Sequence, residues 1–128
     1  MILLDTNVLI EILKGNQKTI EQIQSFDTTL AISSITVMEL YYGALNKMEL
    51  NKLEKFVSLF QIIQLNEAIS TQATKLIKTY AKSHTLDIPD GLIASTALVK
   101  RCKLFTYNVK DFKYIKHIDL LSQAIIAK

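Results

Sequence analysis

The residues best suited to chemistry in this chain are four acids that lie far apart in the sequence. They are Asp5, Glu39, Asp90 and Asp111. Magnesium and manganese prefer oxygen ligands and usually keep several waters, so one or two carboxylates per ion, together with substrate phosphates, form a working site. If the fold gathers these acids, the chemistry that they indicate is hydrolysis of a phosphodiester bond with the help of Mg²⁺ or Mn²⁺.

The elements that must position these acids follow from short apolar runs that alternate with helical patterns. Runs of strand length lie at residues 1–4, 30–32, 62–65 and 104–106. Apolar stripes of helical spacing begin at Val8, extend from Val37 to Met48 and from Ile69 to Tyr80, and begin again near Pro89. Buried strands alternating with amphipathic helices predict an α/β fold of three layers, with a central, mostly parallel sheet and helices on both faces.

The acids are expected at one edge of this sheet, because ligands of such sheets bind beyond the carboxyl ends of the strands. Each acid also has a structural explanation that remains open. Asp5 could end a strand and cap the next helix, and Glu39 has the spacing of a capping box. Asp90 and Asp111 could each occupy a first helical turn, where the helix dipole favours an acid. All four explanations place the acid at a helix start, so one edge would still hold four carboxylates.

Four short segments occur in a fixed order along the chain. They are Leu-Asp-Thr-Asn-Val at residues 4–8, Ser-Ser-Ile-Thr-Val-Met-Glu-Leu-Tyr-Tyr-Gly at 33–43, Asp-Gly-Leu-Ile-Ala-Ser at 90–95 and Leu-Phe-Thr-Tyr-Asn-Val-Lys-Asp-Phe at 104–112. Together they resemble the motifs of the PIN domains, and within them the VapC-type toxins of toxin–antitoxin pairs. The resemblance implies a PIN-like fold and a metal-dependent endoribonuclease that cuts RNA and is held in check by a cognate antitoxin.

The resemblance also implies roles for individual residues. Asp5, Glu39 and Asp90 match the three main acids of the family and would form its catalytic and metal-binding site. Asp5 and Asp90 are expected to bind the ion directly, and Glu39 to orient or deprotonate the attacking water within the same site. Thr6 and Thr106 are expected to hydrogen-bond phosphate or a ligand.

One position departs from the family pattern. Many relatives carry an acid two residues after the threonine of the last motif, where this chain has Asn108. An amide oxygen can bind magnesium but brings no charge, so Asp111 is expected to supply the missing carboxylate. Asp111 and Asn108 would then hold a second, weaker ion, and whether one or two ions bind is left open.

The net charge of +3 is concentrated in the last third of the chain. Residues 1–83 hold eight lysines and eight acids, whereas residues 84–128 hold seven lysines and arginines against four acids. Basic residues beside exposed aromatic ones hold single-stranded RNA, so Lys110 and Lys113 are predicted to bind the substrate. The alternative is a solvated lysine face over a buried aromatic core. The aromatic residues in question are Phe105, Tyr107, Phe112 and Tyr114.

Length and composition predict one domain that comprises residues 1–128. The apolar runs are too short to span a membrane, no secretion signal precedes the first motif, and the single cysteine, Cys102, cannot form an internal disulfide. These features favour a cytoplasmic protein without a membrane partner.

Two protein partners are expected besides RNA, a cognate antitoxin and a second copy that gives a homodimer. Met38 and Tyr42 project from one side of a predicted helix, and more apolar residues crowd the next helix than a small core requires. The open alternative is that both sets are simply buried. The residues of the second set are Leu50, Leu53, Phe56, Val57 and Phe60.

A rival function also remains open at this point. The missing acid at Asn108 is compatible with a PIN fold that binds RNA or protein without cutting it. Dependence of RNA cleavage on magnesium distinguishes the enzyme from the binding module.

Overall fold

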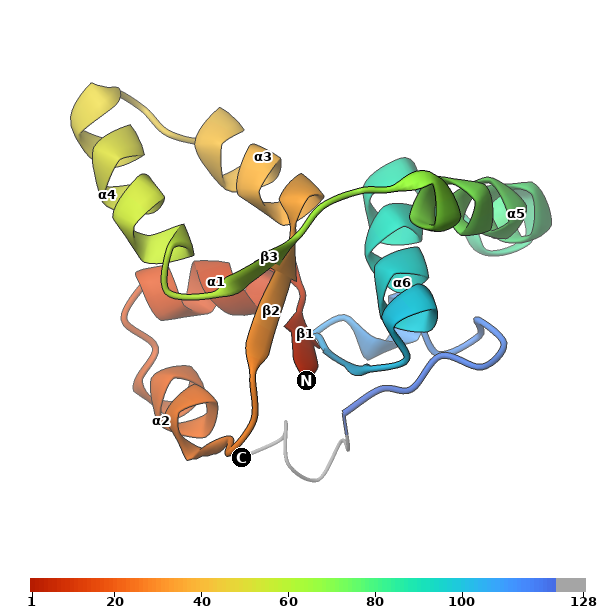
Figure 1. The fold of residues 1–128 in the computed structure, drawn as a ribbon, viewed down its shortest axis with the longest axis horizontal. Coiled ribbons are helices and arrows are strands. Elements are labelled where there is room, and N and C mark those ends of the chain that lie inside the picture. The colour runs from red at the N-terminus through yellow and green to blue at the C-terminus, as the bar shows by residue number, and fades with distance from the viewer. Residues whose placement is uncertain (122–128) are drawn as a thin grey trace.

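The computed structural model describes residues 1–121, and the expected domain of residues 1–128 therefore includes seven residues, 122–128, outside the described part. Its strands are β1 (Ile2–Leu4), β2 (Leu30–Ser33), β3 (Gln61–Ile63) and β4 (Lys103–Phe105). Its helices are α1 (Thr6–Leu13), α2 (Gln17–Ser25), α3 (Ser34–Tyr42), α4 (Lys47–Val57), α5 (Glu67–His84) and α6 (Ile88–Lys100), and a short 3-10 helix, η1 (Val109–Asp111), follows β4 (Figure 1).

The four strands form one parallel sheet in the order β3-β2-β1-β4. This confirms the α/β fold predicted from the sequence. The first strand is central, because β1 pairs with β2 on one side and with β4 on the other. Leu4 is paired with Phe105, so the next residues, Asp5 and Thr106, leave the sheet side by side at its carboxyl edge.

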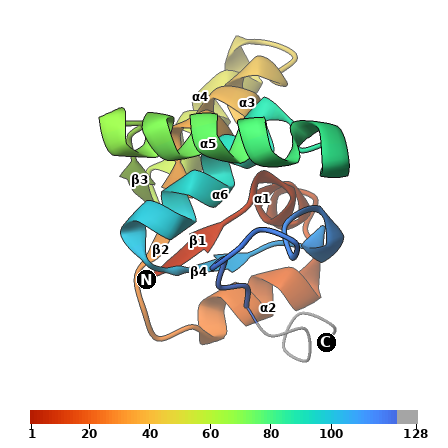
Figure 2. The same ribbon diagram turned by 90° about the vertical axis from the view of Figure 1, so that its right-hand side faces the viewer.

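Alternation along the strands divides the interior into two cores, one on each face of the sheet. Leu3 and Leu104 belong to the core beneath α5 and α6, whereas Leu4 and Phe105 belong to the core beneath α1 and α4. Figures 1 and 2 show the resulting layers, with α5 and α6 on one side of the sheet and α1 and α2 on the other. The helices on both faces confirm the expected three-layer arrangement.

The helices differ from the sequence prediction in two places. The stripe expected to continue from Val37 to Met48 is divided, because α3 ends before Gly43 and the side chain of Asn46 caps α4 by accepting from the Glu49 N–H at 2.9 Å. Helix α2 was not predicted, since its sequence Gln-Lys-Thr-Ile-Glu-Gln-Ile-Gln-Ser holds too few apolar residues for a clear stripe.

Helices α5 and α6 pack closely at Gly91. A Cβ atom placed there would lie 2.9 Å from Cδ1 of Ile77 and 3.9 Å from Cδ2 of Leu86. The side chain of Ile77 therefore fills the space that a larger residue at position 91 would need. Within residues 1–121, no helix is both long enough and apolar enough to cross a membrane.

Candidate active site

Asp5 lies at the carboxyl end of β1 and is buried, with 4% of its surface exposed. Its Oδ1 accepts a hydrogen bond from the Thr6 N–H at 2.8 Å, which makes it the cap of α1, and its Oδ2 accepts from the Thr106 hydroxyl at 2.8 Å. The capping explanation for Asp5 is thus correct, but it accounts for only one carboxylate oxygen. The second oxygen is held by a residue that lies one hundred and one positions later in the sequence.

Glu39 reaches the same edge from α3, although not from the helix start. The cap of α3 is Ser33, so the expected capping box at Glu39 is wrong, and Glu39 lies further along the helix. Its Oε1 accepts from the Thr6 hydroxyl at 2.8 Å, and the Thr36 hydroxyl lies 2.9 Å from that of Thr6. Because the single hydroxyl hydrogen of Thr6 goes to Glu39, Thr36 must donate to Thr6. This chain of hydroxyls fixes one oxygen of an otherwise exposed carboxylate.

Asp90 lies in the first turn of α6, as expected, and is half-buried. The helix is capped by another acid, Asp87, whose Oδ1 accepts from the Asp90 N–H at 2.9 Å. Asp87 was not among the residues singled out from the sequence. The signal that could have found it is its position before Ile88 and Pro89, the place of an N-cap ahead of a proline-containing first turn.

Asp111 closes the short helix η1, and Asn108 precedes that helix. The Asn108 N–H donates to the Thr106 hydroxyl at 3.0 Å, while its side chain makes no capping hydrogen bond. Asn108 is exposed and Asp111 is half-buried. The loop after β4 is tied to the start of α1 as well, because Asn7 accepts from the Tyr107 N–H at 3.4 Å.

Burial first, and then the charges of neighbouring acids, raise the pKa values of two carboxyl groups at this edge. Burial, and then the charges of Asp87, Asp5, Asp111 and Glu39, raise the pKa of Asp90 from 3.8 to about 7. Burial also raises the pKa of Asp5; hydrogen bonds from Thr106 and Thr6 lower it in part, and the charges of Glu39 and Asp111 raise it further. Raised carboxylate pKa values with like-charge neighbours are typical of sites that bind cations or move protons.

The donor chemistry of this edge fits a hard divalent cation. It offers carboxylate, hydroxyl and amide oxygens, without cysteine or histidine among the residues just described. Within residues 1–121, no three Asp, Glu, His or Cys side chains converge closely enough to hold one metal ion directly. Magnesium usually takes one or two carboxylates and completes its shell with water and phosphate, and Asp5 and Asp90, whose charges act on each other, are the candidate pair.

The aromatic residues after β4 do not form the exposed surface expected from their interleaving with lysines. Phe105 and Phe112 are fully buried, and Tyr107 and Tyr114 are half-buried. Lys110 and Lys113 are both exposed. A lysine face over a largely buried aromatic core, the alternative left open by the sequence, is therefore the better description of this segment.

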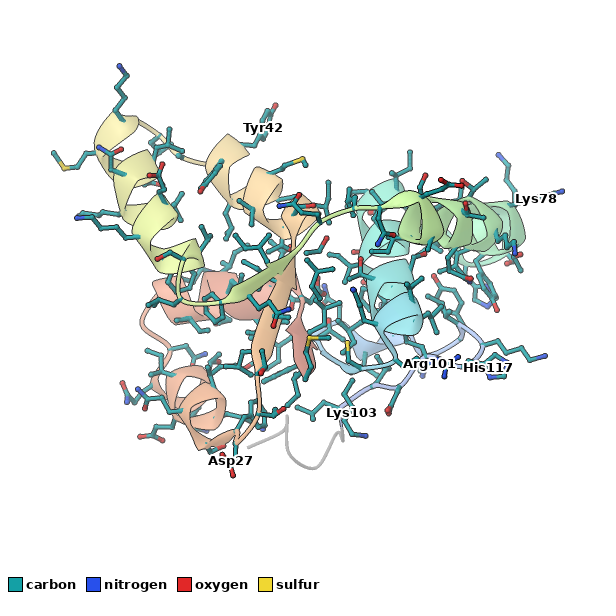
Figure 3. All side chains as sticks on the ribbon, in the orientation of Figure 1. Asp27, Tyr42, Lys78, Arg101, Lys103 and His117 are labelled. Carbon is teal, nitrogen blue, oxygen red and sulfur yellow. The ribbon has the colours of Figure 1, made fainter. Side chains whose placement is uncertain are left out.

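The apolar surplus of α3 and α4 separates into buried and exposed sets. Leu53 and Val57 belong to the core, whereas Met38 and Tyr42 are 54% and 94% exposed. Leu50, Phe56 and Phe60 are half-buried. Tyr42 projects outward from α3 (Figure 3), and with Met38 and Glu39 it lines a cavity of about 380 Å³. The unpartnered surface is thus on α3 and the loop after it, and burial explains the inner side of α4.

Known proteins match this chain over nearly its whole length. The PIN domain family matches residues 2–118. A relative named ribonuclease VapC1, from Methanocaldococcus jannaschii, is 33% identical over 120 residues, which cover 93% of this chain and 84% of the relative. A toxin–antitoxin complex from Klebsiella pneumoniae contains a chain that is 30% identical, with a TM-score of 0.80 and coverage of 95% and 97%. A VapBC2 structure from Rickettsia felis, bound to a promoter DNA fragment, is 30% identical with a TM-score of 0.81 and coverage of 94% and 98%.

These matches and the edge of carboxylates define the class of protein: the chain belongs to the PIN-domain family. PIN-domain nucleases generally depend on divalent metal ions. Within that family the chain is a VapC-type ribonuclease, an enzyme of the hydrolase class.

Proposed function

We propose that this chain, as a single domain of residues 1–128, is the toxin of a type II toxin–antitoxin pair and cuts RNA with Mg²⁺ or Mn²⁺ held at the carboxyl edge of the sheet. The observation that carries the proposal is the geometry of this edge, where the buried carboxylate of Asp5 is held by Thr106 and the carboxylate of Glu39 is held by Thr6. Burial and four neighbouring acids raise the pKa of Asp90 to about 7 at the same edge. An edge that bears this much negative charge is stabilised by a divalent cation. RNA is the substrate class indicated by the names of the relatives.

Asp5 and Asp90 are the proposed ligands of the ion. Thr106 supports Asp5 by donating to the carboxylate oxygen that does not cap α1. When bound, the ion supplies Lewis acidity toward the scissile phosphate and lowers the pKa of a water. Only oxygen donors surround the two carboxylates, which suits Mg²⁺ and Mn²⁺ rather than softer metals.

Glu39 is the proposed group that orients the attacking water or accepts its proton. One oxygen is fixed by the Thr6 hydroxyl, so the other is free to accept from the water. Thr6 therefore acts on RNA through Glu39, although it was first considered as a contact to phosphate. Asp111 and Asn108 are proposed to hold a second ion more weakly, because only one of them carries a charge.

Lys110 and Lys113 flank Asp111 and are proposed to contact RNA phosphates. Both side chains are exposed, and both lie beside the acid that joins the site from η1. Contacts to phosphate act without regard to sequence, so these lysines would strengthen binding without choosing the RNA.

The partners and the compartment follow from the same family. The structural neighbours are toxin–antitoxin complexes, so we assign this chain a cognate antitoxin. We also propose a homodimer, for which the exposed apolar residues of α3 offer a surface, and a place in the cytoplasm, whose reducing conditions suit the free Cys102. The proposed partner surface comprises the exposed apolar residues of α3 and the chain that follows it. They are Met38, Tyr42, Leu45 and Met48.

This surface suits an amphipathic antitoxin helix. Such a helix lays its apolar side into a groove, and Glu39 lines the cavity here, where a basic side chain of the antitoxin would neutralise the acid. Tyr42→Ser with Leu45→Ser is expected to lower the oligomeric mass or weaken antitoxin binding. Leu59→Ser is the matched control, since Leu59 is 76% exposed but lies beyond α4. Unchanged mass and binding in the double variant would remove this surface from consideration.

The test of the enzymatic proposal is cleavage of total RNA by the purified protein, with the ends of the products mapped. The parent should cut in Mg²⁺ or Mn²⁺ and not in chelator. Asp5→Asn and Asp90→Asn should fold and lose most cleavage. Asp27→Asn, a change at an exposed residue of the α2–β2 loop (Figure 3), should cut like the parent. A parent that binds RNA but leaves it intact at millimolar metal would establish the non-cleaving alternative.

A further inference from the structure

An aromatic stack lies beside the acidic edge and has no part in the mechanism above. The rings of His84 and Tyr114 are 4.1 Å apart at their centroids and nearly parallel, with an interplanar angle of 9°. Tyr80 meets both rings edge-on, at 5.7 Å from His84 and 5.0 Å from Tyr114. The three residues come from the end of α5 and from the segment after η1, so the stack joins two parts of the chain.

Two of these rings have a structural function. Tyr80 and Tyr114 are half-buried and pack against the core beneath α5 and α6. The Tyr80 hydroxyl also accepts a hydrogen bond from the Lys116 N–H at 3.2 Å, which holds the segment after η1 to α5. His84 differs from these two tyrosines, because its side chain is exposed and does not pack against that core.

The orientation of the His84 ring is fixed although the residue is exposed. One face lies on Tyr114, and Nδ1 is 2.7 Å from the Ser83 hydroxyl. Because His84 is exposed, part of the imidazole remains accessible to solvent in the plane that the stack sets. An exposed, pre-oriented aromatic face is the element on which proteins stack bases of single-stranded RNA.

The stack is close to the candidate site along both of its chain segments. His84 precedes Asp87 by three residues, and Tyr114 follows Asp111 by three, so the Cα atom of each aromatic residue is at most about 11 Å from that of an acid of the edge. The pKa of Tyr114 agrees with this placement, because it is raised by burial and then by the charges of Asp90, Asp111 and Asp87.

Exposed lysines accompany the stack. Lys82 lies in the last turn of α5, two residues before His84, and Lys113 directly precedes Tyr114. Positive charge that follows a backbone, combined with an aromatic face, is the usual arrangement for holding single strands.

We propose that His84, stacked on Tyr114, is a platform for an unpaired nucleobase of the RNA adjoining the nucleotide that is cut. This rests on the proposed function, since it assigns a base subsite to the same cleavage site. A stacking surface makes no hydrogen bonds to the edge of the base, so it does not distinguish bases by their hydrogen-bonding pattern. It accepts an unstacked base and favours the base that stacks most strongly. Base-paired RNA would be excluded, because its bases cannot reach the ring.

The experiment measures the affinity of the protein for two oligonucleotides of equal length by fluorescence anisotropy, with chelator present to prevent cleavage. One oligonucleotide is single-stranded RNA of mixed sequence, and the other has abasic spacers in place of the nucleosides. Both carry the same phosphates, so their difference in affinity reports base contacts. His84→Ala should weaken binding of the base-bearing strand by about 5- to 100-fold and leave the abasic strand unchanged. His84→Phe, which retains a ring, should keep most of the preference.

The matched control is His117→Ala. His117 is also an exposed histidine, but it lies near Arg101 at the opposite end of α6 (Figure 3), on a cavity that Lys116 also lines. It should bind both strands like the parent, whereas Lys113→Ala should weaken both strands equally. Thermal melting of each variant checks that the fold is retained.

The outcomes separate this inference from the proposed function. If the parent prefers the base-bearing strand and His84→Ala keeps that preference, the platform is wrong while the nuclease remains. If His84→Ala and His84→Phe lose it equally, the ring is not a stacking surface and the proposal fails. If the parent binds neither strand and cuts no RNA, both proposals are overturned together.

Discussion

The hydroxyl of Thr106 donates a hydrogen bond of 2.8 Å to the buried carboxylate of Asp5, and this contact joins the last strand of the sheet to the first. The same hydroxyl oxygen accepts from the Asn108 N–H at 3.0 Å and from the Asn7 amide at 3.4 Å. Thr106 is itself fully buried, so its function is to orient Asp5 and the loop after β4 rather than to contact RNA. A carboxylate held in this way offers a metal ion a defined direction.

Replacement of this hydroxyl should weaken metal binding more than it unfolds the protein. Thr106→Val keeps the shape of the side chain but leaves Asp5 with one partner fewer. We expect metal affinity, measured by the metal dependence of the melting temperature or by calorimetry, to fall about 10- to 100-fold. Thr106→Ser retains the hydroxyl and should stay close to the parent. Equal metal affinity in the valine and serine variants would contradict the orienting function.

The raised pKa of Asp90 predicts how stability depends on pH in the absence of metal. The unfolded carboxyl ionises near 3.8 and the folded one near 7, so the folded state binds more protons between these values. The free energy of unfolding should therefore fall as pH rises from about 4 to about 7, and the buried Asp5, whose pKa is also raised, contributes in the same direction. Thermal or denaturant unfolding in chelator measures this decline.

Asp90→Asn should remove the contribution of Asp90 to the fall of the unfolding free energy with pH. The variant should therefore be more stable than the parent at pH 8 without metal. Asp27→Asn, at an exposed residue, serves as the control and should keep the parental slope. Added Mg²⁺ or Mn²⁺ should reduce the decline in the parent, since a cation favours the ionised carboxylates. A parent whose stability is constant from pH 4 to pH 8 would refute the raised pKa of Asp90.

The contact between Gly91 and Ile77 predicts a measurable coupling between α5 and α6. Gly91→Ala gains up to about 1 kcal/mol of helix stability but pushes its Cβ against Cδ1 of Ile77. Ile77→Val removes that atom and alone should cost about 0.5 to 1.5 kcal/mol. We expect the double variant to be more stable than the sum of the single changes by about 1 kcal/mol. Additivity in denaturant unfolding would show that the two helices adjust without strain.

Substitution of Ser95, in the middle of α6, by alanine is predicted to be neutral or stabilising. Among the described residues its hydroxyl alone is a buried side-chain group without a hydrogen-bond partner. Ser95→Ala removes this unsatisfied group and should be neutral or stabilising by about 1 kcal/mol. Thr96→Val is the control, because the Thr96 hydroxyl donates to the Leu92 carbonyl at 2.8 Å and its loss should destabilise. A large loss of stability in Ser95→Ala would reveal a partner for that hydroxyl.

The sheet was predictable because its strands are short and largely apolar, and because the two inner strands, β1 and β2, are mostly buried. Each predicted run, such as the one ending at Leu4, overlaps a strand of the structure. The helix α2 was not predictable in the same way, since tertiary packing and the Asn16 cap hold a sequence with little periodicity. The prediction of one apolar stripe from Val37 to Met48 was wrong, because apolar residues continue at helical spacing past Gly43 by chance. Met48 is 70% exposed and does not belong to a buried stripe.

The acids of the site were identifiable from their motifs, but the contacts that orient them were not. Nothing in the spacing of Thr6, Thr36 and Glu39 reveals that three side chains from two helices form one chain of hydrogen bonds. Such contacts depend on the angle at which α3 crosses α1, which is set by packing rather than by local sequence. The stack of His84 on Tyr114 is of the same kind, because thirty positions separate its members.

The place of β1 at the centre of the sheet has a consequence for synthesis of the chain. β1 is made before the other described elements, whereas one of its two neighbours, β4, is made after all six described helices. Asp5 cannot meet Thr106 until β4 has been made, because the two residues follow adjacent strands. A product that stops before β4 lacks Thr106 and Asp111, so we expect its candidate site to be incomplete.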